Sequence, residues 1–123
     1  MSGQQKMILV VDDEPDIVFA LVTILEDAGY HTIAKAKADH LAQQMHQSEQ
    51  LPDLILLDML LSGQRGTEIA RELKQHPTTR HIPILMLSAH PNAEREAKAA
   101  GADGFIPKPF DMDDLLEKVA AFL

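Results

Sequence analysis

Short, continuously apolar runs alternate along this chain with segments whose apolar residues recur at helical spacing. Three of these runs, at residues 7–11, 54–57 and 84–87, have only four or five residues, and each stops at a polar residue. A short apolar run without polar alternation predicts a strand that is covered on both faces. We therefore expect three central parallel strands.

Two further segments are weaker strand candidates. Residues 32–36 are less uniformly apolar, which suits an edge strand, and Phe105 with Ile106 would form a short last strand. The alternation of strands and helical patterns, five times over, implies right-handed crossovers. This pattern predicts an α/β fold with a doubly wound, five-stranded parallel sheet and five helices on its two faces.

The helical patterns differ in strength. The first has Pro15 in its first turn and Gly29 as its stop signal, and the last is the apolar set within residues 112–119. Three weaker patterns lie between them, at residues 41–45, 69–73 and 93–100.

Size and charge restrict the class of protein. A chain of 123 residues suits one domain, which we expect to span residues 1–123 with an ordered core from about residue 6. A net charge of -8 argues against direct binding to nucleic acid. Because no apolar run approaches the roughly 20 residues of a membrane span and the start does not resemble a signal peptide, we expect a cytoplasmic protein without membrane contact.

Polar residues follow the expected central strands at the point where each strand ends. These residues are Asp12, Asp13, Asp58, Ser88 and Lys108. In an open parallel sheet, ligands collect beyond the carboxyl ends of the strands. Each residue alone is more often a helix cap or a solvated surface residue, but their coincidence at one edge favours a functional site.

Three converging carboxylates repel one another unless a cation neutralises them. The candidate ligands are all oxygens, which favours a hard cation, and Mg²⁺ is typical of sites that handle phosphate. Lys108 would add a positive charge toward phosphoryl oxygens, and Ser88 would add a hydroxyl donor. The residues therefore predict phosphoryl transfer.

Four stretches resemble the signatures of bacterial response-regulator receiver domains, the chemotaxis-type receivers of two-component systems. They are VVDDEPDI, LILLDMLLSGQRGTE, ILMLSAH and GADGFIPKPF, and the resemblance covers essentially the whole chain. It implies a flavodoxin-like sheet of order 2-1-3-4-5. It also implies a histidine kinase or histidine phosphotransfer domain as the phosphoryl donor, and a downstream protein or output domain as the target.

The resemblance also implies a role for each matched residue. Asp58 matches the phospho-acceptor, and Lys108 matches the essential lysine, which precedes an expected cis bond to Pro109. The implied Mg²⁺ ligands are Asp12, Asp13, Asp58 and the backbone carbonyl of Leu60. Ser88 and Phe105 match the switch hydroxyl and the switch aromatic residue, which move together after phosphorylation. Such a domain is not an enzyme for other substrates, because it catalyses only its own phosphorylation and dephosphorylation.

Some positions depart from the family pattern. Ser62 stands where proline is usual, and Phe105 lacks the hydroxyl of the commoner tyrosine. The stretch between Ser88 and Lys108 is slightly short and rich in alanine, so we expect a short, mobile fourth helix. Of the six histidines, His90 alone lies near the mouth of the site, where it could touch the phosphoryl group or an attacking water, although a surface role is the simpler interpretation.

Two other functions use similar residues. A haloacid-dehalogenase-type phosphohydrolase also needs a second aspartate two positions after its nucleophile, and that position here is Leu60. A pseudo-receiver that binds partners without phosphate usually lacks the acceptor, an acidic residue or the lysine. All of these are present in this chain.

Overall fold

The structure is a computed structural model that describes residues 5–37, 41–46, 50–61 and 63–123. Within these ranges, nothing is described of the side chains of Ala42 and His46. Ser62, where proline was expected, lies outside the described residues. Among the described residues, no helix has the length and apolar character needed to span a bilayer.

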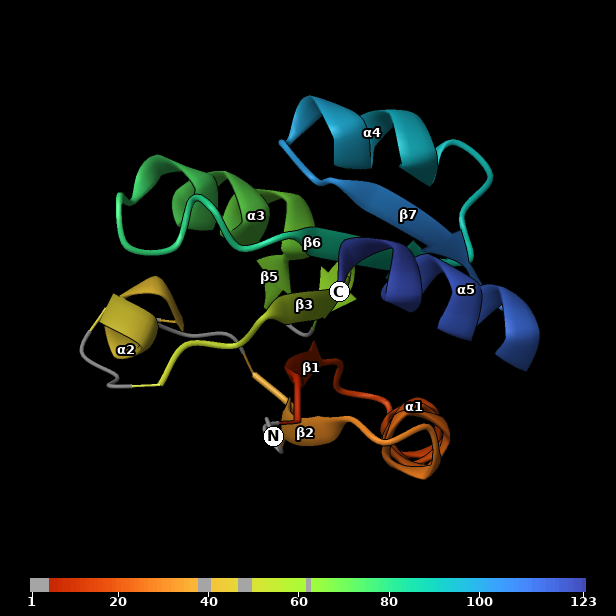
Figure 1. The fold of residues 1–123 in the computed structure, drawn as a ribbon. Helices are drawn as coiled ribbons and strands as arrows, with labels where there is room; N and C mark the ends of the chain where they lie inside the picture. The colour runs from red at the N-terminus through yellow and green to blue at the C-terminus, as the bar shows by residue number, and fades with distance from the viewer. Residues whose placement is uncertain (1–4, 38–40, 47–49, 62) are drawn as a thin grey trace.

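One five-stranded parallel sheet forms the centre of the molecule (Figure 1). Its strands are β1 (Met7–Val11), β2 (His31–Lys35), β3 (Leu54–Asp58), β6 (Ile84–Ser88) and β7 (Gly104–Pro107). They are ordered β2-β1-β3-β6-β7, and each neighbouring pair is parallel. Counted along the chain this is the order 2-1-3-4-5, so the expected topology is confirmed.

Within the described residues, five helices cover the two faces of the sheet. They are α1 (Pro15–Asp27), α2 (Leu41–His46), α3 (Gly66–Gln75), α4 (Ala93–Ala99) and α5 (Met112–Phe122). One apolar cluster joins the sheet to α1 and α5, and the other joins it to α2, α3 and α4. The sheet is therefore doubly wound, and α4, with seven residues, is as short as its sequence indicated.

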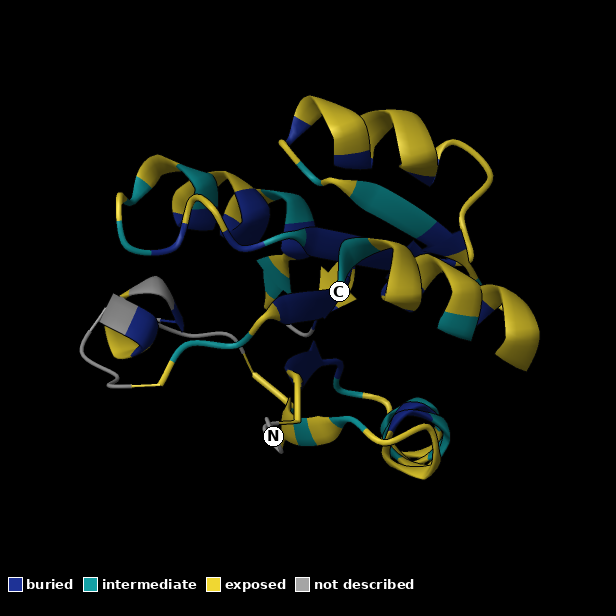
Figure 2. Cartoon of the chain, in the orientation of Figure 1, coloured by how far each residue is buried: buried dark blue, intermediate teal, exposed yellow. Residues whose placement is uncertain are grey.

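Burial follows the pattern of the apolar runs (Figure 2). All five residues of β1, of β3 and of β6 are buried, which the continuous apolar runs predicted for strands covered on both faces. The edge strand β2 is mostly exposed or half-buried. Within β2, the side chain of Ile33 is exposed, at 42% of its full accessible surface.

A small hairpin that the sequence did not predict follows β3. Strands β4 (Leu60–Leu61) and β5 (Gln64–Arg65) pair antiparallel, and α3 begins directly after them at Gly66. A Cβ atom on Gly66 would overlap the backbone carbonyl of Asp58, so only glycine allows this close approach. The hairpin thus returns the chain to the end of β3 before α3 starts.

Candidate functional site

The carboxyl ends of the central strands bring polar side chains together at one edge of the sheet. Asp12 follows β1, Asp58 ends β3, Ser88 ends β6 and Lys108 follows β7. Asp12, Asp58 and Ser88 are only 0%, 4% and 6% exposed. Ionisable groups are seldom buried to this degree unless they are paired, so this cluster needs partners within the site.

Lys108 supplies the partner for the buried carboxylates. Its Nζ lies 3.1 Å from Oδ2 of Asp12, 3.2 Å from Oδ1 of Asp58 and 3.3 Å from Oε1 of Glu14. The backbone N–H of Lys108 donates to the carbonyl of Ser88 at 2.9 Å, which fixes the loop after β7 against the end of β6. The expected cis peptide between Lys108 and Pro109 is confirmed.

Three carboxylates form the acidic centre: Asp12, Glu14 and Asp58 each place an oxygen within 4.8 Å of the others. Glu14 was not singled out from the sequence. The backbone N–H of Glu14 donates to Oδ1 of Asp12 at 2.9 Å, and this turn places both residues at the same edge. The only available signal was the acidic run that follows the first strand.

Asp13 occupies a different part of the edge. It is half-buried, and it does not belong to the group of close carboxylates that the described residues form. Instead, Asp13 lines an apolar groove between α1 and β2, beside Asp12. The role of Asp13 as a metal ligand therefore stays a prediction, as does that of the backbone carbonyl of Leu60.

The site changes the proton affinity of its charged groups. Burial raises the pKa of Asp58 above its ordinary value, and the negative charge of Asp12 raises it further. Lys108 and the backbone of Leu60, which both hydrogen-bond to the Asp58 carboxylate, oppose this rise only in part. Burial also lowers the pKa of Lys108, but its bonds to Asp12 and Asp58 outweigh that effect and raise it.

The donor set fits a divalent cation. The clustered ligand atoms are carboxylate oxygens, which hard ions such as Mg²⁺ prefer, and the centre holds three carboxylates against one lysine. A bound cation would relieve the repulsion that raises the pKa of Asp58. The arrangement therefore suits a divalent metal ion beside a buried carboxylate nucleophile.

Ser88 and Phe105 connect the site to the α4 side of the sheet. The backbone N–H of His90 donates to Oγ of Ser88 at 3.0 Å. Phe105 in β7 is half-buried and packs against the apolar cluster that includes α4. Its backbone carbonyl accepts a hydrogen bond of 2.8 Å from Nζ of Lys118 on α5.

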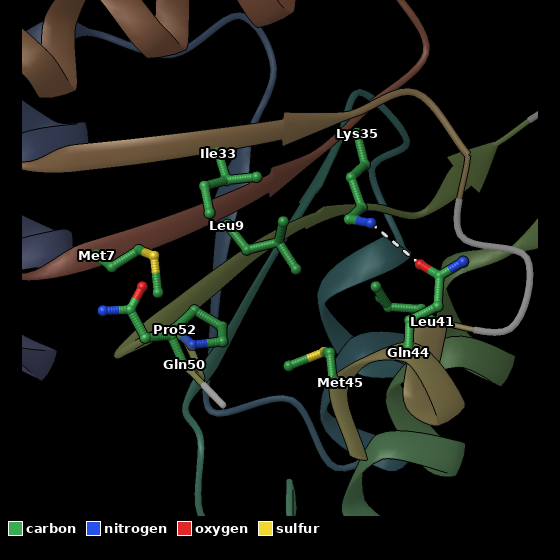
Figure 3. A pocket seen from close by; sticks show the side chains of 9 residues that line it. All are labelled: Met7, Leu9, Ile33, Lys35, Leu41, Gln44, Met45, Gln50 and Pro52. Carbon is green, nitrogen blue, oxygen red and sulfur yellow. Dashed lines mark hydrogen bonds between the residues drawn. The ribbon is translucent and has the colours of Figure 1, made fainter. Parts of the chain in front are cut away.

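A second groove lies between the sheet edge and α2 (Figure 3). Its walls are largely apolar, with Ile33 and Met45 among them, and none of the described residues that line it carries a carboxylate or a hydroxyl. Lys35 lines it as well, and its Nζ donates to Oε1 of Gln44 at 3.0 Å. The described lining of the groove therefore offers a cation but no carboxylate that could accept a phosphoryl group.

The family model of the response regulator receiver domain matches residues 8–120. The chain belongs to this receiver family. It is thus a receiver domain of the kind found in two-component response regulators, which are signalling domains and not conventional enzymes.

Several regulatory proteins contain a region similar to this chain. The chain is 39% identical over 122 residues to the phosphate regulon transcriptional regulatory protein PhoB of Pseudomonas aeruginosa, covering 96% of this chain and 52% of that protein. It is 40% identical over 114 residues to the nitrogen assimilation regulatory protein NtrX of Azorhizobium caulinodans, covering 89% of this chain and 24% of that protein. The receiver spans about half the length of the PhoB proteins that it matches.

Solved structures share the fold of the receiver along nearly its whole length. A response regulator from Chloroflexus aurantiacus matches with a TM-score of 0.90 and 31% identity, covering 97% of this chain and 98% of that one. The receiver domain of the sensor histidine kinase PA1611 from Pseudomonas aeruginosa matches with a TM-score of 0.86 and 26% identity, covering 97% and 98%. That structure has a magnesium ion coordinated in its active-site cleft.

Proposed function

We propose that Asp58 accepts a phosphoryl group from a phosphohistidine of a histidine kinase or histidine phosphotransfer domain. The observation that supports this most is the pairing of Asp58, which is 4% exposed, with Lys108 at 3.2 Å. Asp58 also ends a central strand at the edge where Asp12 and Ser88 lie. A carboxylate in this position has a cation and a hydroxyl beside it for the incoming phosphoryl oxygens.

The chemistry follows from these positions. A carboxylate oxygen of Asp58 attacks phosphorus in line, the bond from phosphorus to the donor nitrogen breaks, and the imidazole leaves with the electron pair. The Lys108 ammonium and the Ser88 hydroxyl donate to phosphoryl oxygens as charge builds on them. The domain acts on itself alone, so the donor protein supplies the substrate.

We propose Mg²⁺ as the divalent ion of the acidic centre. Its ligands would be the carboxylates of Asp12, Asp13 and Asp58 with the backbone carbonyl of Leu60, and Glu14 lies close enough to contribute. When bound, the ion neutralises the carboxylates and the transferred phosphoryl group. Protein groups would fill only part of its shell and water would complete it, so the affinity should be low.

Phosphorylation would act through Ser88 and Phe105. The hydroxyl of Ser88 moves toward the acyl phosphate, Phe105 turns into the vacated space, and the surface of α4, β7 and α5 changes. A downstream protein or an output domain reads this surface. PhoB and NtrX are regulatory proteins that are longer than this chain, which supports an output domain as a target of a receiver of this kind.

The donor protein would dock over α1. A groove of about 490 Å³ between α1 and β2 is lined by Val18, Phe19 and Val22. Phe19 is 75% exposed, and Asp12 lines both this groove and the acidic centre. An apolar surface that continues into the acceptor site suits a partner that must place a histidine there.

Mass measurement tests the acceptor directly. After treatment with acetyl phosphate and Mg²⁺, the intact receiver should gain the mass of one phosphate, and Asp58→Asn should gain none. Asp53→Asn is the matched control, because Asp53 precedes the opposite end of the same strand and is exposed. Phosphate that persists in Asp58→Asn, or a wild-type chain that gains none, would refute the proposal.

A further inference from the structure

The outer edge of β2 has no neighbouring strand among the residues that the structure describes (Figure 1). On the inner side, the backbone N–H of His31 donates to the carbonyl of Lys6, just before β1, at 2.9 Å. Backbone groups of successive residues in a strand point to alternate sides. The N–H and carbonyl groups of Thr32 and Ala34 therefore point outward, where an added strand could bond to them.

The side chains of β2 alternate between the two faces of the sheet. Oγ1 of Thr32 donates to Oε2 of Glu26 on α1 at 2.7 Å, so Thr32 lies on the α1 face. Ile33 and Lys35 lie on the opposite face, where both line the groove between the sheet edge and α2 (Figure 3). An added strand would place every second side chain on this face, beside the groove.

The groove suits one apolar side chain. Its volume is about 250 Å³, below the roughly 300–1,000 Å³ that is usual for pockets of small molecules. Its lining includes Leu9 and Met45, which are 4% and 5% exposed, whereas Ile33 at its rim is 42% exposed. An apolar residue opposite Ile33 on an added strand would cover this exposed surface.

Lys35 adds a positive charge at the next position on the same face. It is half-buried, and its Nζ donates to the neutral Oε1 of Gln44 at 3.0 Å. Among the described residues it forms no ion pair with a carboxylate. A partner's carboxylate would give it a charged acceptor. The net charge of -8 acts mostly over longer distances, where salt screens it, so the local charge favours an acidic strand.

A second copy of the chain fits this edge less well. Antiparallel pairing of two β2 strands about Ile33 would place Lys35 of one copy opposite His31 of the other. Residues 31–35 contain no carboxylate, so Lys35 would gain no charged partner. The edge therefore matches a different strand better than it matches itself.

We propose that β2 binds an extended acidic segment of a partner protein as an additional antiparallel strand. Thr32 and Ala34 exchange backbone hydrogen bonds with this segment, which supply affinity. One apolar side chain lies opposite Ile33 at the groove, and a carboxylate two positions before it meets Lys35, which together supply specificity. This recognition needs no phosphoryl group, so it does not depend on the proposed role of Asp58.

A model peptide tests the charge requirement. The probe is fluorescein-labelled Thr-Thr-Glu-Thr-Leu-Thr-Thr, whose glutamate would lie opposite Lys35 when its leucine lies opposite Ile33. Binding to the full chain is measured by fluorescence polarisation at physiological salt. Lys35→Glu should weaken binding about tenfold, because two carboxylates then face each other. A second peptide with lysine in place of glutamate should show the reverse preference, binding Lys35→Glu better than wild type.

A backbone variant tests strand pairing itself. Ala34→Pro removes one outward N–H and keeps the bonds to β1, since proline is tolerated where the N–H of an edge strand faces solvent. It should weaken binding about tenfold. Ala34→Val is the matched control, because it keeps the N–H, and it should bind like wild type. Amide exchange followed by NMR should show that the peptide protects Thr32 and Ala34 without changing Ile33.

The charge swap and the protection of the two outward amides must occur together. Equal binding of both peptides by wild type and Lys35→Glu would overturn the inference, as would unchanged binding by Ala34→Pro. No binding at millimolar peptide would overturn it as well. Dimerisation of the chain in sedimentation experiments, with the same two amides protected in the absence of peptide, would assign the edge to a second copy and refute an acidic partner.

Discussion

The ammonium nitrogen of Lys108 lies 3.2 Å from a carboxylate oxygen of Asp58, although the two residues are 50 positions apart in the sequence. The same nitrogen lies 3.1 Å from Asp12, which is fully buried. One cation thus holds two buried carboxylates that would otherwise repel each other. The stability of the site and its chemistry therefore depend on the same contacts.

Removing this cation should destabilise the metal-free protein. The Lys108 side chain is 11% exposed, so Lys108→Met leaves Asp12 and Asp58 without their buried partner. We expect a loss of about 2 kcal/mol in the free energy of unfolding, reduced by protonation of one carboxylate. Urea unfolding in EDTA measures it. Mg²⁺ should recover part of the loss, because a bound cation neutralises the same carboxylates.

Lys98→Met is the control for this change. Lys98 pairs with Glu94 at 3.5 Å, but its side chain is 68% exposed. An exposed pair of this kind contributes at most about 0.5 kcal/mol. If Lys108→Met lowered the free energy of unfolding in EDTA no more than Lys98→Met does, the buried ion pairs would contribute nothing measurable to stability.

The raised pKa of Asp58 gives a pH dependence with a definite sign. Because burial and then Asp12 raise this pKa in the folded state, folding favours the protonated carboxyl. The stability linked to Asp58 is therefore present below its ordinary pKa of 3.8 and is lost as the pH rises through the folded pKa. At neutral pH the ionised group opposes folding. Asp58→Asn should thus be more stable than wild type in EDTA at pH 7.

Thermal unfolding at several pH values measures this effect. The difference between Asp58→Asn and wild type should shrink toward pH 4 and should also shrink when Mg²⁺ is added at pH 7. Asp53→Asn changes an exposed carboxylate that accepts a hydrogen bond from the backbone N–H of Met7, so it should not be more stable than wild type. A mutant less stable than wild type at pH 7 in EDTA would show that the Lys108 contact outweighs the burial of Asp58.

The Mg²⁺ affinities of single mutants should show which residues of the acidic centre bind the ion. The resemblance implies Asp13 as a ligand, whereas the close carboxylates are those of Asp12, Glu14 and Asp58. We expect weak binding that Asp13→Ala abolishes and Asp12→Ala weakens. Titration calorimetry measures each affinity. Glu14→Gln is the informative comparison, since a loss there with normal binding by Asp13→Ala would assign the ligand to Glu14 instead.

The apolar pattern predicted the central strands and the sheet edge that carries the polar residues, because continuous apolar runs such as residues 54–57 leave few alternatives to a buried strand. The strand order followed from the resemblance to receiver domains. The sequence also predicted that Asp12, Asp58 and Lys108 would converge. It did not predict the hairpin at residues 60–65, because two-residue strands carry no periodicity. Glu14 was missed for a related reason: its position depends on a local turn about Asp12, and an acidic residue just before a helix resembles an ordinary cap.

The surface formed by α4, β7 and α5 should respond to phosphorylation through α4. This helix has seven residues, and its buried positions include Ala93 and Ala97, which offer little apolar area to hold it on the sheet. By contrast, α1 buries Leu21 and Leu25 completely. A helix held so weakly should open locally and often, so its amide hydrogens should exchange faster than those of α1 in the unphosphorylated protein.

Activation should therefore order this segment instead of moving a rigid helix. Fluoroberyllate, which mimics an acyl phosphate on aspartate, should draw Ser88 toward Asp58, and the backbone N–H of His90 that donates to Ser88 links this movement to the start of α4. Hydrogen exchange followed by mass spectrometry should then show the largest gain in protection between residues 88 and 104, with little change in α1. Asp58→Asn, which cannot bind the mimic covalently, should show no gain. The opposite result would be hydrogen-exchange protection of α4 that equals that of α1 before activation and does not change afterwards. In that case the signal must travel by a displacement of the intact helix. The position of Phe105, and not the order of α4, would then distinguish the two states.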